Sequence, residues 1–189
     1  MNFKVASTSR AKIRAFVETI WDLFGFIPES HKSFPVVEFL ERFMPSYDSD
    51  FTLEILSDEE MENGALHGET IPSLHTIRLS ESVYNGANGA CGGSGRDRMT
   101  IAHEIGHYLM HFDECPTFAS VENNYEIPAY RSSEWQAKAF AGELLIPYTE
   151  KNKLSVQDIT DFYGVSEEAA IFQKCKADNR NYKNKGKII

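Results

Sequence analysis

The sequence of 189 residues has few cysteines and no long apolar run. Its three cysteines, Cys91, Cys115 and Cys175, form no C-x-x-C pair, so neither a disulfide framework nor a cysteine-based metal site is expected. No apolar stretch approaches the roughly 20 residues that a membrane span needs. The opening M-N-F-K-V-A-S-T-S-R also lacks the apolar centre of a signal peptide. We therefore expect a cytoplasmic protein without membrane segments.

Two nucleotide-binding motifs are also missing. The glycine-rich stretch Asn85 to Gly95 has no G-K-S/T ending and no G-x-G-x-x-G pattern after a strand, so it does not indicate phosphate binding. We interpret it as a mobile loop at the mouth of a site. The net charge of -9 argues against non-specific nucleic-acid binding by the whole surface and would suit a basic partner.

The chain does contain enough apolar sequence, 42% of its residues, for one compact domain with a core. Apolar residues recur at three- and four-residue steps in residues 9–24 and 35–43, which predicts two N-terminal helices. Apolar and polar residues alternate near 51–55, 65–69 and 74–80, which predicts strands. The predicted fold is therefore α+β, with a small sheet of about three strands packed on helices.

A helix-turn-helix-like pair of short helices is predicted within residues 154–174. Glu167 and Glu168 stand where a DNA-reading helix would begin, and their charges would repel phosphates. Packing or protein contact is therefore favoured over DNA binding. We divide the chain into a domain of residues 1–150, which includes the N-terminal helices, and a C-terminal helical segment with a basic tail, residues 151–189.

The most informative stretch is R-D-R-M-T-I-A-H-E-I-G-H-Y-L-M-H-F, residues 96–112, which contains an H-E-x-x-H motif. Four residues are slightly more than one helical turn, so His103 and His107 lie on one face and can offer two nitrogens to one tetrahedral metal ion. Glu104 is about a quarter of a turn away, at the position of a metallopeptidase general base. Most other positions are apolar, so burying these groups without a metal would be costly.

A third protein ligand is expected, because catalytic zinc sites usually carry three. Glu134 is favoured, since it lies in the first turn of a second predicted helix, residues 131–147, whose small residues would allow close approach to the first. Glu143 lies on the other side of that helix. Asp113 is the alternative ligand, although no glycine turns the chain back. His111 is too far along the first helix to share the ion, so we expect it behind the ligands or on the surface.

Other residues have less specific interpretations. His67 and His75 are single histidines on predicted strands and are interpreted as surface or structural residues. An extended peptide is expected along the edge of the sheet, beside residues 74–80, because main-chain hydrogen bonds would hold it over the metal. Candidate donors to the oxyanion of a peptidase are three tyrosines, Tyr108, Tyr125 and Tyr130.

The H-E-x-x-H stretch and the later E-W-Q-A-K-A-F-A-G-E-L-L-I-P, residues 134–147, together resemble the ImmA/IrrE metallopeptidase family, minigluzincin-like proteins of bacteria and their mobile elements. The resemblance covers roughly residues 73–147. It departs from the family at Gln136, where many relatives carry a second acid, and at Lys138, where asparagine is common.

The resemblance implies a zinc site, with manganese as the alternative metal, and a peptidase activity. The implied ligands are His103, His107 and Glu134, with Glu104 as the catalytic base. The implied substrate is a protein, a helix-turn-helix transcriptional repressor of the phage type. The alternative function is a regulatory or toxin–antitoxin-type protein whose metal is structural and whose C-terminal helices contact protein or DNA.

Overall fold

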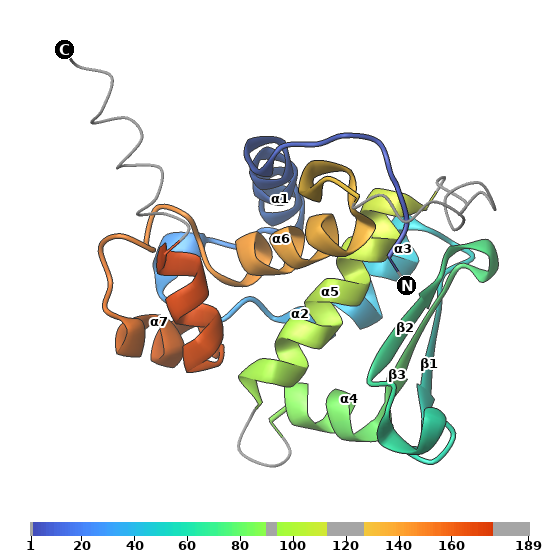
Figure 1. Ribbon diagram of the computed structural model, residues 1–189. Coiled ribbons are helices and arrows are strands. Elements are labelled where there is room, and N and C mark those ends of the chain that lie inside the picture. The colour runs from blue at the N-terminus through green and yellow to red at the C-terminus, as the bar shows by residue number, and fades with distance from the viewer. Residues whose placement is uncertain (1, 90–93, 113–126, 176–189) are drawn as a thin grey trace.

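The computed structural model describes residues 2–89, 94–112 and 127–175. Helix α5 crosses the centre of the molecule, with the sheet on one side and α6, followed by α1, on the other (Figure 1). None of the described helices is long and apolar enough to span a bilayer. The helices are α1 (Arg10–Phe24), α2 (Val36–Glu38), α3 (Met44–Tyr47), α4 (Glu81–Ala87), α5 (Gly95–His111), α6 (Ser133–Leu145) and α7 (Val156–Tyr163), and the strands are β1 (Thr52–Leu56), β2 (Gly68–Ile71) and β3 (Thr76–Ser80).

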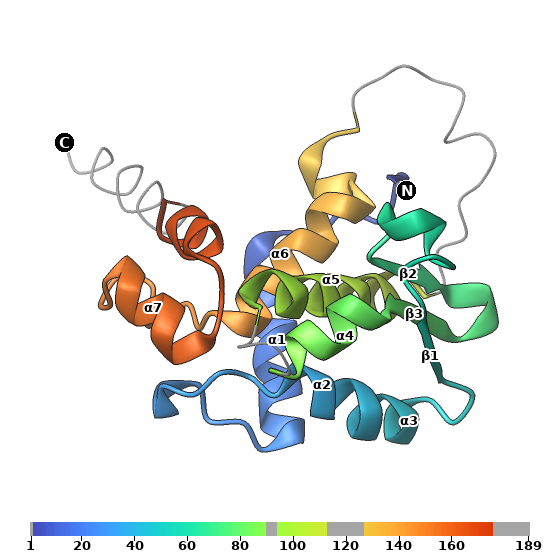
Figure 2. The same cartoon turned by 90° about the horizontal axis from the view of Figure 1, so that it is seen from below.

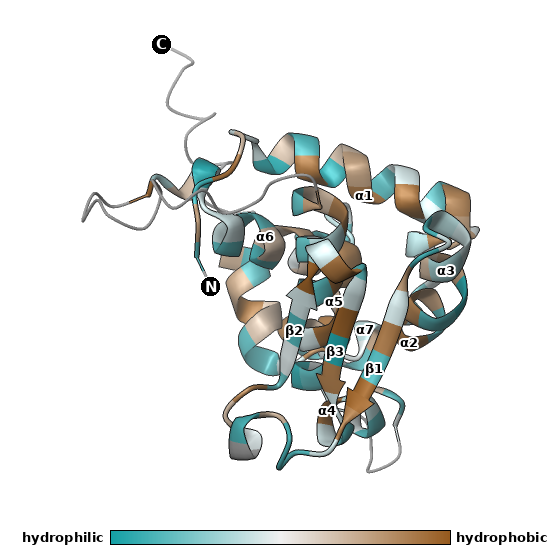
Figure 3. Ribbon diagram, turned by 90° about the vertical axis from the view of Figure 1, so that its right-hand side faces the viewer, coloured by the Kyte–Doolittle hydropathy of each residue, from teal (hydrophilic) through white to brown (hydrophobic). Residues whose placement is uncertain are grey.

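The sheet has the strand order β1-β3-β2, which Figure 3 shows face on. In the parallel pairing of β1 with β3, Leu53 lies opposite Ile77, and β2 runs antiparallel with Thr70 opposite the same residue. The α+β prediction is therefore confirmed. The expectation that a peptide lies beside residues 74–80 is wrong, because β3 is paired on both sides and is buried as a central strand. The edge strand next to α5 is β2.

The two predicted N-terminal helices are present, and the second is longer than predicted. Ser9 begins α1 by accepting a hydrogen bond from the main-chain N–H of Lys12, and Gly25 ends it with a φ of 73°. The second helical stretch continues past Phe43 to Tyr47 through a π-helical turn, Phe39–Phe43. Pro45 lacks an N–H and clashes with the preceding turn of a regular helix, which accounts for the widened turn before it.

Helix α4 was not predicted, and it overlaps the start of the expected glycine-rich loop. Its N-cap is Ser80, whose hydroxyl accepts a hydrogen bond from the main-chain N–H of Val83, and Glu81 stands in its first turn. These helix-start signals are present in the sequence. The helix was not predicted because the glycines that begin at residue 86 favoured a loop. The end of the expected loop, residues 90–93, lies outside the described residues.

Helices α5 and α6 cross in close contact. Gly106 on α5 faces α6, where an added Cβ atom would lie only 2.9 Å from Cδ1 of Phe140 and 3.3 Å from Cα of Ala137. Ala137, one of the small residues of α6 predicted to permit close approach, therefore lies at the contact between the two helices. Ser132 caps α6 by accepting a hydrogen bond from the main-chain N–H of Trp135, which fixes where the helix begins and places Glu134 in its first turn.

The predicted C-terminal pair of helices is also present, as α7 and a helical stretch at residues 167–175. Gly164, with a φ of 60°, ends α7. The turn that follows packs on the start of α5, since a Cβ atom on Gly95 would lie 2.3 Å from the carbonyl carbon of Val165. Buried Ile159 and Ala170 join this pair to the main core.

A buried cluster of charged side chains connects α6 with α1 and the chain that follows α6. Glu143 is 1% exposed. Its carboxylate accepts hydrogen bonds from Nε of Arg10 at 2.5 Å and Nε of Arg14 at 2.9 Å, and Nζ of Lys151 lies 3.3 Å away. Burial alone would raise the pKa of Glu143, but the charge of Lys151 and the hydrogen bonds from the two arginines outweigh it and lower the pKa to about 2.

Replacing Glu143 by Gln should destabilise the protein by about 3–5 kcal/mol, because three buried or partly buried cations would lose their carboxylate. Urea unfolding at pH 7 measures this. Glu81→Gln, on the exposed start of α4, is the matched control and should change the unfolding free energy by less than about 0.5 kcal/mol. An equal effect of the two changes would contradict the role of the cluster.

The same carboxylate predicts a pH dependence. Because the pKa of Glu143 is lower in the folded protein than its ordinary value of 4.5, its stabilisation is present above that value and is lost as the pH falls toward about 2. The difference in unfolding free energy between wild type and Glu143→Gln should therefore shrink between pH 5 and pH 2. A constant difference over that range, measured by urea unfolding, would contradict the prediction.

Candidate metal centre

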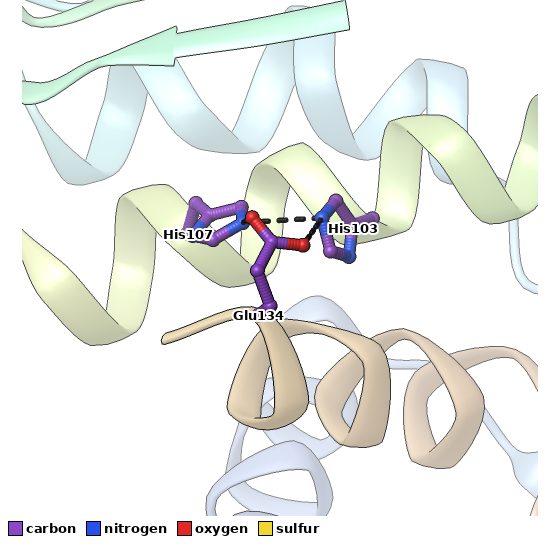
Figure 4. Close-up of side chains that lie close together, drawn as sticks. All are labelled: His103, His107 and Glu134. Atoms are coloured by element: carbon purple, nitrogen blue, oxygen red, sulfur yellow. Dashed lines mark hydrogen bonds and ion pairs between the residues drawn. The ribbon is translucent and has the colours of Figure 1, made fainter. Parts of the chain in front are cut away.

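The structure brings His103, His107 and Glu134 together between α5 and α6 (Figure 4). The two Nε2 atoms are 3.1 Å apart. Oε2 of Glu134 lies 3.4 Å from Nε2 of His103, and Oε1 lies 3.4 Å from Nε2 of His107. The side chains of His103 and then His107, which lie against the carboxylate, lower the pKa of Glu134 below its usual value, so the carboxylate is charged.

These separations suit a tetrahedral ion. Zinc bonds to nitrogen and oxygen of about 2.0–2.1 Å place neighbouring tetrahedral ligand atoms about 3.3 Å apart. The distance between the two Nε2 atoms, and the distance from each Nε2 atom to one of the two oxygens of Glu134, lie within 0.2 Å of that value. Two neutral imidazoles that approach through unprotonated nitrogens would repel each other, whereas a cation between them removes the repulsion. The donor set of two imidazoles and one carboxylate therefore fits a zinc ion.

Glu104 lies beside this cluster on the side of the sheet. Its side chain is buried, with 7% of the residue exposed. The hydroxyl of Thr70 on β2 lies 2.7 Å from Oε2 of Glu104 and 3.0 Å from its main-chain carbonyl oxygen. Thr70 therefore ties the edge strand to α5 and fixes the direction of the carboxylate. A Cβ atom on Gly68 would lie 2.9 Å from Cγ of Glu104, so the strand can approach this closely only because that residue is glycine.

His111 lies behind His107 and is buried rather than on the surface. The Nδ1 atoms of these two residues are 3.3 Å apart, and Nε2 of His111 lies 3.1 Å from Oε1 of Gln136. The amide nitrogen of Gln136 donates to the carbonyl oxygens of Ala6 and Tyr130. Burial lowers the pKa of His111 to about 4, so this imidazole is neutral at physiological pH.

A cleft of about 560 Å³ opens over the cluster. Its floor is α5, one wall is β2 and the other wall is the start of α6 with Phe3. The apolar residues that line it are Phe3, Leu66, Ile71, Pro72 and Phe112. A peptide segment could thus reach the three clustered side chains from the solvent.

Neither of the two candidate oxyanion-donor tyrosines that the structure describes lines the cleft. Tyr108 does not line the cleft. Its hydroxyl donates to Oδ2 of Asp48 at 2.6 Å, so it is not placed to donate to an oxyanion over the cluster. His75 contacts the same oxygen through Nδ1 at 2.7 Å, which agrees with a structural role. Tyr130 is 53% exposed and does not line the cleft. Tyr125 and the alternative ligand Asp113 lie outside the described residues.

Two cleft residues were missed at the level of sequence. Thr70 sits in a short polar strand, and only the pairing of β2 beside α5 gives it a role. Phe3 is separated from the rest of the cleft by more than 60 residues of sequence, and no pattern near it signals a site. Alternation could have placed Thr70 on one face of a strand, but no local signal could have found Phe3.

Comparison with known proteins agrees with the motifs. Residues 90–173 match a peptidase family described as the IrrE N-terminal-like domain, which confirms the resemblance to the ImmA/IrrE metallopeptidases. A solved Mycobacterium tuberculosis transcriptional regulator is similar, with a TM-score of 0.53 and 13% identity, over 86% of this chain and 46% of that one. The chain thus spans less than half of that protein, and the likeness shows the fold alone. No curated protein matches the chain.

Gln136→Met should destabilise the protein by about 1–3 kcal/mol, because it leaves the Nε2–H of buried His111 and two main-chain carbonyl groups without their partner. Lys138→Met, two residues further along α6 on its exposed side, is the control and should have little effect. Urea unfolding compares the two. Equal stability of both variants would show that the hydrogen-bonded chain behind His107 does not stabilise the fold.

Proposed function

We propose that this protein is a zinc-dependent metalloendopeptidase, because residues 90–173 match a peptidase family described as the IrrE N-terminal-like domain. The observation that carries the proposal is the convergence of His103, His107 and Glu134 beside the buried carboxylate of Glu104. The first three residues would hold the ion, with manganese as the alternative to zinc. When bound, zinc supplies a Lewis acid that lowers the pKa of a water molecule and polarises a peptide carbonyl group.

Glu104 is proposed as the general base. Its carboxylate would accept the proton of the attacking water and later deliver it to the leaving amine. The hydrogen bond from Thr70 occupies one side of Oε2 and so fixes the carboxylate without neutralising it. The role follows from position, since Glu104 comes directly after His103 on α5 but is not part of the ligand cluster.

His111 and Gln136 are proposed to set the tautomer of His107. Nε2 of His107 faces the cluster, so in the neutral imidazole the proton lies on Nδ1 and is donated to Nδ1 of His111. His111 then carries its own proton on Nε2 and donates it to Gln136. Such a partner behind a ligand fixes the orientation of the ring and strengthens its binding to metal.

The substrate is proposed to bind as an extended peptide along β2. Among the described residues no strand pairs with the outer edge of β2, so its main-chain groups can bond an added strand. All four residues of β2, Gly68–Ile71, line the cleft beside the cluster. A peptide held there would have its main chain beside Glu104 whatever its side chains are.

The family resemblance extends the proposal to the kind of substrate, a helix-turn-helix transcriptional repressor. The net charge of -9 supports a basic protein partner of this kind, because opposite charges accelerate encounter. The C-terminal helices are proposed to pack or to contact protein rather than DNA. Glu167 and Glu168 at the start of the last helical stretch are exposed, so their charges would oppose binding to phosphates.

Glu104→Gln tests the catalytic role. The amide keeps the shape and the hydrogen bond from Thr70 but cannot accept the water proton, so peptide cleavage should fall by about 10²–10⁴-fold while zinc content is unchanged. Mass spectrometry of a repressor or casein digest measures cleavage, and elemental analysis measures zinc. Glu81→Gln is the control. Full activity of Glu104→Gln would exclude proteolysis at this site.

Glu134→Ala tests the ligand set. Changing a residue that only supports a metal ligand typically weakens metal binding by roughly 10–100-fold. Removing one of the three ligands themselves should therefore weaken zinc binding by more than this. Titration with a fluorescent zinc chelator measures the affinity. Lys138→Ala, at an exposed position of the same helix, is the control and should leave zinc affinity unchanged. Unchanged affinity in Glu134→Ala would rule out this residue as a ligand.

A further inference from the structure

The N-terminal residues 2–8 lie against the chain that leads into α6. Lys4 and Ser132 form an antiparallel bridge, and the main-chain N–H of Val5 donates to the carbonyl oxygen of Arg131 at 2.9 Å. Figures 1 and 2 both show the N-terminal end between α6 and β2, the two walls of the cleft. Main-chain hydrogen bonds thus hold this segment at the mouth of the proposed active site.

Phe3 is fixed by its own main chain. Its N–H donates to Oγ of Ser133 at 3.0 Å, and its carbonyl oxygen accepts from the N–H of Ser133 at 3.1 Å. The side chain lines the cleft, where its ring meets that of His111 edge to face at a centroid distance of 6.0 Å. The ring stays partly exposed, so it is held in place without being packed into the core.

Phe3 shares the cleft with other apolar residues. Phe112 follows His111 directly on the chain and lines the same cavity, as do Ile71 and Pro72 at the end of β2. His111, which meets the Phe3 ring, also contacts the imidazole of His107, so one residue separates Phe3 from the ligand cluster. A side chain next to the peptide bond over the cluster would therefore meet aromatic and aliphatic surface.

From this arrangement we infer that Phe3 forms part of a specificity subsite for a large apolar side chain next to the cleaved bond. The inference rests on the proposed function and adds to it a requirement on the substrate. A leucine, methionine or phenylalanine would bury its surface against the Phe3 ring, whereas a charged or amide side chain would lose water without gaining a hydrogen bond. Phe3 lies about 100 residues before His103 in the sequence. Its proposed role is to select the peptide, not to take part in cleavage.

Peptide mixtures randomised at each position test the subsite. Wild-type protein should release products enriched in apolar residues at one position beside the cleaved bond, as mass spectrometry shows. Phe3→Ala should lower that enrichment about five- to tenfold, the loss expected for one aromatic contact, and leave other positions unchanged. Leu23→Ala, an exposed apolar residue on α1, is the control. Enrichment that is the same in Phe3→Ala and wild type would overturn the inference.

A binding measurement separates this inference from the proposed function. Glu104→Gln protein, alone and combined with Phe3→Ala, is titrated with fluorescent peptides that differ only in a central leucine or asparagine. Tighter binding of the leucine peptide that depends on Phe3 supports the subsite even if wild type cleaves nothing, in which case only the peptidase proposal fails. If wild type cleaves peptides but its preference for leucine does not depend on Phe3, the peptidase proposal stands and the subsite is overturned. Failure to bind either peptide would overturn the subsite.

Discussion

The close crossing of α5 and α6 is the constraint on which the rest of the site depends. His103 and His107 come from one helix and Glu134 from the other, so their atoms converge only if the two helix axes approach closely. Gly106 facing Ala137 permits that approach, and the cap at Ser132 sets where α6 starts. A larger side chain at this crossing would separate the donors by more than a tetrahedral ion can bridge.

Helix α6 carries two carboxylates, Glu143 and Glu134, whose neighbouring side chains differ in charge. Glu143 faces Arg10, Arg14 and Lys151, so permanent protein cations balance its charge. Glu134, nine residues earlier on the other side, faces the two imidazoles of His103 and His107. The first carboxylate holds the helices together, while the second would balance part of the charge of an ion held between it and the imidazoles. This difference in surroundings would separate the structural acid Glu143 from the proposed ligand Glu134 on the same helix.

Much of this architecture could be read from the sequence, because its signals are local. The H-E-x-x-H spacing placed His103 and His107 on one face, and the N-terminal helices and strands followed from periodicity. The position of Glu134 near them was favoured by helix-start signals and the resemblance. Strand order could not be read, since alternation does not say which strand is central, and β3 was mistaken for an edge. Contacts between distant segments, such as Phe3 with His111, leave no trace in local sequence.

The pairing of residues 2–8 with the entry to α6 also has a practical consequence. Any polypeptide joined ahead of residue 2 starts at the rim of the cleft, beside Phe3 and the edge of β2. If the cleft binds peptides as proposed, an affinity tag placed there would compete with them for the cleft. Recombinant protein intended for activity measurements should therefore have its tag removed from that end.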